Sequence, residues 1–292
     1  EFRTRENRLS RLNREVFSQD DDWTSEGVSL QWEQDIRPTY RLLAEAYYSY
    51  YREHAVIKTT FQQRRLLQEN PIRDLSFRNE RFNELDEVGG RIWLQTDANW
   101  KLGLSATRPQ STYLFLQDST VVLSGVERGM IGALFAERRW ENERGFLEIG
   151  GRFSYYDLDN TFRLAPRIQG QYAIADNLNL KAATGRHFQY LRELNYENRL
   201  GESLPFWVVS GTEWFPVGES WNGMIGLEFT SATWNIDLEV YHKKPLEVVE
   251  VAAVRPSFRD ADILPGRAPD FRIFTGNGRI WGGDLLVTYR QN

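Results

Sequence analysis

The chain has 292 residues, a net charge of −5 and a mean hydropathy of −0.56, yet 14% of its residues are aromatic. The acidic balance and the lack of a concentrated basic segment argue against nucleic acid as a partner. Cysteine is absent, which excludes disulfides, thiol catalysis and Cys-based metal sites. No apolar run approaches the roughly 18 residues that a membrane-spanning helix needs, so a barrel is the remaining way to cross a bilayer.

In chain order, the first twelve residues alternate poorly, and we predict a strand there that ends in a loop over 18–23. Clear alternation of apolar and polar residues then predicts further strands. The predicted strands are 27–35, 40–53, 88–97, 100–106, 130–137, 146–156, 162–174, 178–190, 221–229, 234–240 and 281–289. Short turns are predicted at 37–39, 98–99, 138–145, 175–177 and 231–233, and long loops at 60–82, 108–127, 190–220 and 252–277.

The hairpin over 162–190 has the clearest pattern. Its first arm carries apolar residues at even positions, and its second arm resumes the alternation after a turn. Both arms reach the roughly 9–11 tilted residues that a strand needs to cross a bilayer. The polar residues at odd positions of the first arm are Arg163, Arg167, Gln169 and Gln171.

The connections alternate between short and long, which places every long loop at one end of the sheet. Transmembrane barrels show this asymmetry, and their aromatic girdles explain the abundance of rings in so polar a chain. We therefore predict an all-β, antiparallel transmembrane barrel of which about twelve strands are present. The chain lacks an initiator Met and a signal peptide and ends within a strand pattern, so we expect an internal fragment.

No chemical motif favours an enzyme. His54, His187 and His242 lie on separate strands without ligand spacing, so no metal site is predicted. The aspartates at 20–22 are interpreted as a solvated charge run and not as a calcium site. The glycine-rich stretch 276–283 enters a strand, so it is not a phosphate loop, and no Ser-His-Asp set has a nucleophile-elbow context. We expect no catalytic residues and no cofactor.

Several runs occur in an order typical of one family. They are Ala165-Pro-Arg167, then 175–181 (ADNLNLK), 183–190 (ATGRHFQY), Phe206-Trp207, 225–227 (IGL), 239–244 (EVYHKK), 276–278 (GNG) and 282–284 (GGD). With these runs the chain resembles the barrel of TonB-dependent outer-membrane receptors, particularly the class of Bacteroidetes-like bacteria. The resemblance implies a 22-stranded barrel with an N-terminal plug domain and a TonB box. Residues 1–292 would then be part of one barrel domain, with the plug and the C-terminal strands outside this chain.

The resemblance also implies a function, a location and partners. We expect active uptake, across the outer membrane, of a scarce ligand such as a siderophore, a cobalamin-like cofactor or an oligosaccharide. The implied partners are outer-membrane lipid, the TonB complex through the plug, and a small-molecule or glycan ligand, with a surface lipoprotein as a further candidate. Two alternatives stay open: a passive porin or adhesin barrel, and a soluble all-β binding module whose apolar stripes are buried between two sheets.

Alternation also predicts the residues that line the lumen. These residues are expected mainly to contact the plug, with ligand contact second: Arg163, Arg167, Gln169, Lys181, Asp237 and Glu239. The aromatic residues expected in ligand-binding loops are Phe206, Trp207 and Trp214. Unbroken alternation would also turn Arg186 toward lipid, so a bulge or a position above the membrane is predicted there.

Overall fold

The computed structural model describes residues 3–6, 13–63, 73–197, 203–253 and 271–290. These residues form β-strands joined by turns, and they contain no helix that could cross a membrane. The strands of the large sheet are β1 (Arg3–Glu6), β2 (Asn13–Arg37), β3 (Tyr40–Gln63), β4 (Arg73–Thr96), β5 (Trp100–Gln117), β6 (Thr120–Arg128), β7 (Ile131–Asn142), β8 (Gly145–Tyr156), β9 (Thr161–Ala175), β10 (Leu178–Gln189), β13 (Gly218–Thr230), β14 (Trp234–Leu246) and β17 (Ile280–Tyr289). The strands of a second, inner sheet are β11 (Leu191–Glu197), β12 (Ser203–Val209), β15 (Val248–Ala253) and β16 (Phe271–Gly276).

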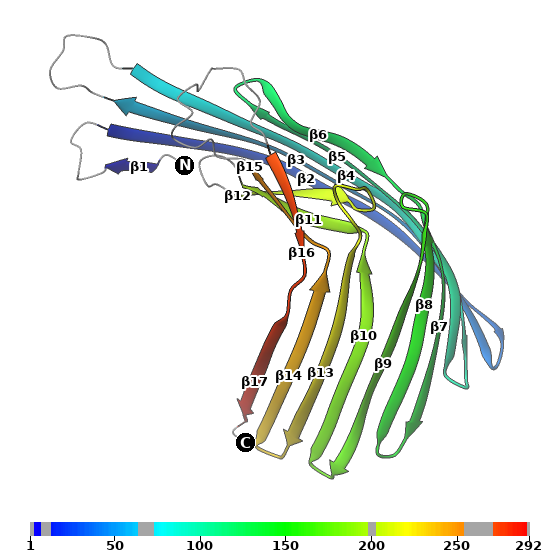
Figure 1. The fold of residues 1–292 in the computed structure, drawn as a ribbon. Coiled ribbons are helices and arrows are strands. Elements are labelled where there is room, and N and C mark those ends of the chain that lie inside the picture. Colours follow the sequence, from blue (N-terminus) through cyan, green and yellow to red (C-terminus); the bar gives the residue numbers. More distant parts are fainter. Residues whose placement is uncertain (1–2, 7–12, 64–72, 198–202, 254–270, 291–292) are drawn as a thin grey trace.

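The large sheet is a single curved, antiparallel wall. Its strands follow the order β1-β2-β3-β4-β5-β7-β8-β9-β10-β13-β14-β17, and β6 also pairs with β5. The wall bends around a concave side, with β1 and β17 at its two edges, and so forms a partial barrel (Figure 1). The predicted fold class is confirmed, and the hairpins β2–β3, β4–β5, β7–β8, β9–β10 and β13–β14 all turn at the same end.

The opposite end of the wall differs from the prediction. The loops predicted at 18–23, 60–82 and 108–127 are wrong in their described parts, because β2, β3, β4 and β5 continue through them as paired strands and β6 returns beside β5. Polar residues there occupy both faces of the ladder, so the period of two that marks a half-apolar strand disappears while the backbone bonds persist.

A proline explains the break between β6 and β7. Pro109 lies in the middle of β5 and has no N–H to donate, so the ladder on that side is interrupted. The N–H of Gly129 still donates to the carbonyl of Pro109 at 3.2 Å. The two strands therefore pair one after the other with the same edge of β5, β6 with residues 110–117 and β7 with residues 100–107.

The inner sheet is formed by the two connections that were predicted as loops over 190–220 and 252–277. The first contributes β11 and β12, and the second contributes β15 and β16, with residues 254–270 outside the described part. The strand order is β12-β11-β15-β16, and β11 pairs with β15 in parallel. This sheet lies on the concave side of the long strands (Figure 1). A buried core joins the two layers, with Tyr113 and Phe115 from β5 packed on Phe206.

The strand β10 changes its environment as it approaches the inner sheet. Its ladder with β9 stops at the pair Gly185–Arg167, while its register with β13 continues unbroken to Gln189. Even-numbered residues of β10 face outward below that point. Above it they turn toward the concave side of the wall, where Phe188 packs against the buried cluster around Tyr156. The same row of side chains thus passes from the outer surface into a protein core.

Side chains of the wall replace a missing strand partner along β12, which is an edge of the inner sheet. The Asn83 side chain donates to the Trp207 carbonyl at 3.0 Å and accepts from the Trp207 N–H at 2.7 Å. Ser111 Oγ accepts from the Val209 N–H at 2.9 Å, and Arg81 donates to the carbonyl of Pro205. Because buried backbone groups need partners, these bonds fix the inner sheet to the wall and cover its edge.

Buried ionisable groups strengthen this attachment. Arg192 donates to the carbonyls of Pro216 (3.1 Å) and Glu247 (2.7 Å), the two points where the chain passes between the wall and the inner sheet. Burial lowers the pKa of this guanidinium. On the wall, Tyr113 donates to Glu127 at 2.9 Å, and burial raises the pKa of Glu127.

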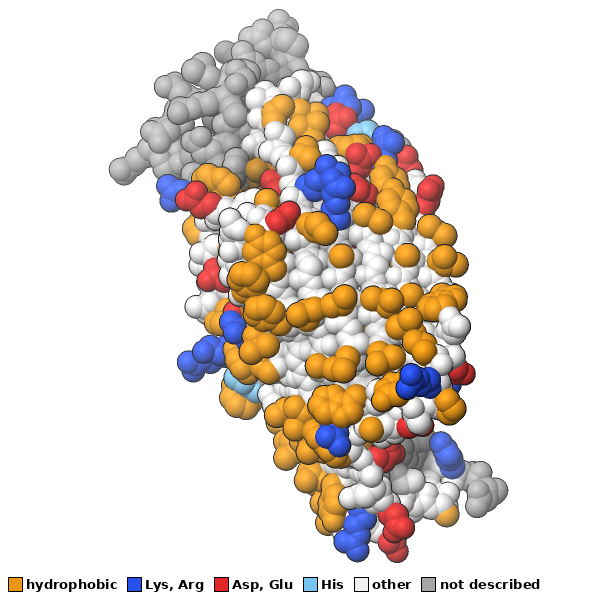
Figure 2. Space-filling view, turned by 90° about the vertical axis from the view of Figure 1, so that its right-hand side faces the viewer, with side chains coloured by type: hydrophobic (Ala, Val, Ile, Leu, Met, Phe, Trp, Pro, Cys, Tyr) orange, Lys and Arg blue, Asp and Glu red, His pale blue; other side chains and the backbone are white. Residues whose placement is uncertain are grey.

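The outward rows are exposed, as the barrel interpretation requires. Phe162 is 63% exposed, Ile225 55% and Leu285 66%. Rows of hydrophobic side chains cross the convex surface (Figure 2). The soluble alternative needs these stripes to be buried between two sheets, and along β9, β13 and β17 they are not. In the part of the chain that the structure describes, two layers occur at the far end of the wall, under the inner sheet.

We expect Asn83→Ala to reduce the free energy of unfolding of the full-length receptor by about 2–3 kcal/mol, because it leaves the Trp207 N–H and carbonyl buried without partners. Hydrogen exchange of the β12 amides should accelerate as well. The control is Asn195→Ala, on the exposed face of β11. Equal effects of the two substitutions in denaturant titration would contradict the role of Asn83 in attaching β12 to the wall.

Adjacent residues of β13 provide a test of the two faces. Ile225 faces outward, whereas Met224 lies on the concave side. Ile225→Arg places a charge in hydrocarbon near the middle of the strand and should cost about 2–4 kcal/mol in a lipid-refolding assay. Met224→Arg should cost much less, and equal costs would show that the assigned faces are wrong.

Candidate functional site

The candidate site is the concave wall formed by β7–β10, β13 and β14. Arg163 identifies the side, since its guanidinium lies over Phe188 and Tyr190 at 5.7 Å from each ring centroid, next to the core beneath the inner sheet. By alternation, the odd-numbered residues of β9 share this side. The structure places all six predicted lumen residues on it, and their functional role stays a prediction.

Arg163 is held at the upper end of the wall. It pairs with Asp159 in the β8–β9 turn, with one guanidinium nitrogen donating at 3.1 Å and the second also in contact. Nearby, the hydroxyls of Tyr190 and Ser154 are hydrogen-bonded at 2.7 Å. This arginine is therefore neutralised and fixed by its own wall.

Arg167 reaches across an intervening strand to its acidic partner. It forms an ion pair with Glu137 of β7, and Gly150 of β8 lies between the two in the ladder. A Cβ on Gly150 would stand 2.7 Å from Glu137 Cγ and 3.3 Å from Arg167 Nε. The ion pair thus occupies the space that glycine leaves open.

The second charged cluster repeats this arrangement. Lys181 of β10 donates to Asp237 at 2.7 Å and to Glu239 at 2.7 Å, both on β14. Gly226 of β13 separates them, and a Cβ there would stand 3.3 Å from Lys181 Cε and 3.1 Å from Glu239 Cγ. In each case a cation crosses a glycine to reach a carboxylate two strands away.

These contacts pair all the predicted lumen charges within the wall, whereas Arg152 of β8 and Lys243 of β14 have no ion pair among the described residues. Gln169 completes the set by donating to Glu148 at 2.9 Å. All four predicted basic or amide residues thus have partners on the wall itself, and the two predicted acids share Lys181. No group of three or more His, Asp or Glu side chains within the described residues could hold a metal ion. The arrangement offers a mixed polar surface and no single-sign pathway for ions.

The three aromatic loop candidates occupy different environments. Phe206 is fully buried in the core between the two sheets, so in this structure it supports the inner sheet and does not reach solvent. Trp207 is half-buried and its backbone is held by Asn83. Trp214 is 63% exposed. Ligand contact through Trp207 and Trp214 stays a prediction.

Arg186 needs no bulge. Its register with β13 is unbroken, and its guanidinium makes two hydrogen bonds of 2.8 Å to Glu219. It also lies over the Phe188 and Trp221 rings, 4.8 and 5.8 Å from their centroids. The residue is neutralised where β10 leaves β9, at the top of the outward row.

Sequence reasoning missed the acidic partners of Arg163, Arg167 and Gln169. These partners are Asp159, Glu137 and Glu148, and each lies outside the predicted set. The available signal was alternation on β7 and β8, since Glu137 and Glu148 occupy the polar faces of their strands. The role of the two glycines depends on the register of three strands, which alternation within one strand does not give.

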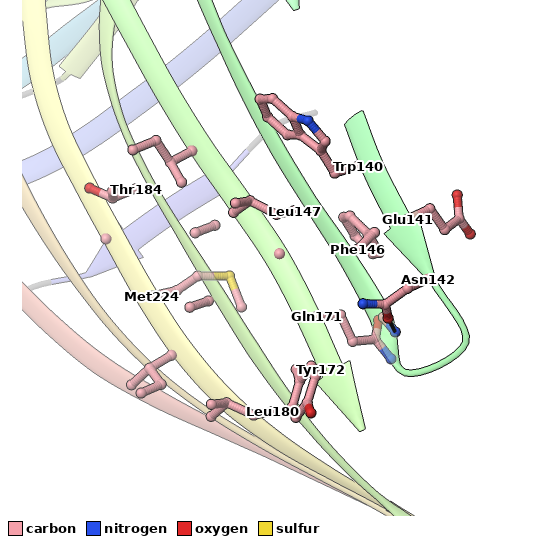
Figure 3. Close-up of a pocket in the computed structure, with 17 residues that line it drawn as sticks. Trp140, Glu141, Asn142, Phe146, Leu147, Gln171, Tyr172, Leu180, Thr184 and Met224 are labelled. Carbon is pink, nitrogen blue, oxygen red and sulfur yellow. Dashed lines mark hydrogen bonds between the residues drawn. The ribbon is translucent and has the colours of Figure 1, made fainter. Parts of the chain in front are cut away.

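A hollow of about 690 Å³ lies over β7–β10 and β13 (Figure 3). Most of its lining residues belong to the outward rows, and three large ones, Trp140, Leu147 and Tyr172, are 42–47% exposed. Gly170 and Ala182 continue the row of Leu147 and leave it open there. We therefore assign this hollow to the convex surface and not to the concave site.

The wall thus has the features of a transmembrane β-barrel, with apolar outward rows and a polar concave side. The family model described as "TonB dependent receptor-like, beta-barrel" matches residues 2–291, so the chain belongs to this family. Members of this family are outer-membrane receptors. No curated protein matches the chain in sequence.

Three solved structures with a similar fold each cover 97% of this chain at 12% identity and a TM-score of 0.50. They are a mutant of the ferric enterobactin receptor PfeA from Pseudomonas aeruginosa (51% of that chain covered), the copper transporter OprC (55%) and the RagAB peptide importer in its closed-closed state (35%). At this identity the likeness shows the fold. The chain spans about half the length of the first receptors that it matches.

The need for glycine beneath the ion pairs that span an intervening strand can be tested by substitution. Gly150→Ala should reduce the free energy of unfolding by about 1–3 kcal/mol, because the new Cβ overlaps the Arg167–Glu137 pair. Gly132→Ala on the outward face of β7 is the control, since a Cβ there meets nothing within 4 Å. Lipid-refolding titrations that give equal values for both variants would contradict the role of Gly150.

Proposed function

We propose that this chain forms part of the wall of an outer-membrane receptor that takes up a scarce ligand by TonB-driven transport. The observation that carries the proposal is a concave wall that carries charges of both signs, several of them paired within the wall, in a chain of the TonB dependent receptor-like family. Mixed, paired charges suit a folded polar domain docked inside the barrel, whereas a simple ion-selective pore favours an excess of one sign. The proposal therefore includes a plug domain that covers this wall and contacts TonB.

The placement in the membrane follows from the two ends of the wall. The short hairpin turns would face the periplasm, and the long strands with the inner sheet would face the exterior. A ligand arriving from outside would then meet the inner sheet first. Trp207 and Trp214 are the proposed aromatic contacts there, and a surface lipoprotein is a further candidate partner at this end.

The proposed ligand is a siderophore, a cobalamin-like cofactor or an oligosaccharide. The names of the fold relatives add copper and peptide to the ligands worth testing. The test is uptake of this panel by cells that express the full-length receptor, with and without a functional TonB. Uptake that persists without TonB would favour a passive pore and contradict the proposal.

The role of the arginines is tested on the full-length receptor with Arg163→Ala/Arg167→Ala. If they contact a plug, surface affinity for the transported ligand should stay unchanged, while uptake changes or the pore leaks. The control is Arg138→Ala/Arg144→Ala near the β7–β8 turn, which removes the same charge away from the concave side. A large loss of surface affinity with normal uptake machinery would make Arg163 and Arg167 ligand residues instead.

A further inference from the structure

Two arginines lie side by side on the convex surface, at the top of the apolar rows. Arg108 is on β5 and Arg128 is on β6, and both side chains are exposed. Arg128 pairs with Gln110, two residues from Arg108 on the same face. The arginines are therefore diagonal neighbours, about 7–8 Å apart at the backbone. Basic and acidic side chains lie together above the hydrophobic rows in Figure 2.

Neither arginine is neutralised by the protein. Within the described residues, Arg108 and Arg128 make no ion pair, side-chain hydrogen bond or ring contact. The nearest acids along the ladders are Asp86, which pairs with Gln110, and Asp157, which accepts the Met130 N–H at 2.6 Å. Neither is within ion-pair distance. Arg186, by contrast, has its own carboxylate at Glu219.

The surroundings of Arg108 are apolar. Val88 is its partner on β4, and Met130 lies opposite on the other side; they are 49% and 51% exposed. The row immediately below consists of the small residues Ala46, Gly90, Ala106 and Gly132. A cation in this position stands at the boundary between hydrocarbon and headgroups, where long basic side chains extend toward the polar layer.

We propose that Arg108 and Arg128 bind the phosphate of a phosphorylated lipid in the outer leaflet. Two planar guanidinium groups present forked N–H donors that match phosphate oxygens, and the anion relieves the repulsion between the two cations. The acyl chains of the same lipid would lie over the row of small residues. A free phosphate would gain nothing from that row, so the lipid is the occupant. The inference rests on the proposed insertion in an outer membrane.

The test uses the full-length receptor in phosphatidylcholine nanodiscs doped with bis-phosphorylated lipid A. Binding is measured as lipid A retained per receptor against lipid A concentration. The variant Arg108→Gln/Arg128→Gln should lose roughly 10- to 30-fold in apparent affinity. Arg108→Lys/Arg128→Lys should retain most of it. The control Arg138→Gln/Arg144→Gln removes two charges at the other rim and should bind as wild type.

Two further arms identify the source of the phosphate. Lipid A without its phosphates should bind wild type and variant equally weakly, and inorganic phosphate should displace lipid A only poorly. Equal lipid A binding by wild type and Arg108→Gln/Arg128→Gln, or ready displacement by inorganic phosphate, would overturn the lipid site. Insertion is checked first by heat-modifiable migration. A wild-type receptor that does not insert contradicts the proposed function, whereas an inserted receptor that fails the binding test contradicts this site alone.

Discussion

Backbone hydrogen bonding within one curved sheet is the constraint on which the rest of this structure depends. In a membrane no water is available to satisfy a broken ladder, so each strand of the wall has to pair with its neighbours throughout. Departures from that rule are local and have identifiable partners. Pro109 interrupts one ladder but still accepts a bond from Gly129, and the edge of β12 is completed by Asn83 and Ser111.

Side-chain charges on the polar side of the wall are also paired within the sheet. Three cations of the concave side, Arg163, Arg167 and Lys181, each have a carboxylate on the wall. Glycines make the longer pairs geometrically feasible, because a side chain at the intervening position would occupy the same space. A wall of this kind presents hydrogen-bonding groups of both signs without a strong net field. Such a surface is suited to contact with another folded polar domain.

Much of the wall could be predicted from sequence, because half-apolar strands carry their own period. The hairpin of β9 and β10 and the outward position of Phe162 and Ile225 follow directly from it. The long strands beyond the apolar band could not be found this way, because polar residues occur on both faces there, even where the inner sheet covers one of them. The inner sheet was missed because β11 pairs in parallel with β15, more than 50 residues away in the sequence. The even-numbered residues of β11 are buried in a protein core, whereas those of β10 before Gly185 face outward. For the site, alternation gave the shared face of Lys181, Asp237 and Glu239 but not their contact across Gly226.

The parallel pairing of β11 with β15 has a mechanical consequence. It joins Tyr196 to Val251 and so links two connections that leave the wall from different hairpins. Arg192 reinforces the link by bonding to the carbonyls of Pro216 and Glu247, one in each connection. Neither connection can swing outward without breaking the other's hydrogen bonds. We therefore expect the described strands of the two connections, β11, β12, β15 and β16, to move together, so that a wider entrance requires displacement of this sheet as a unit.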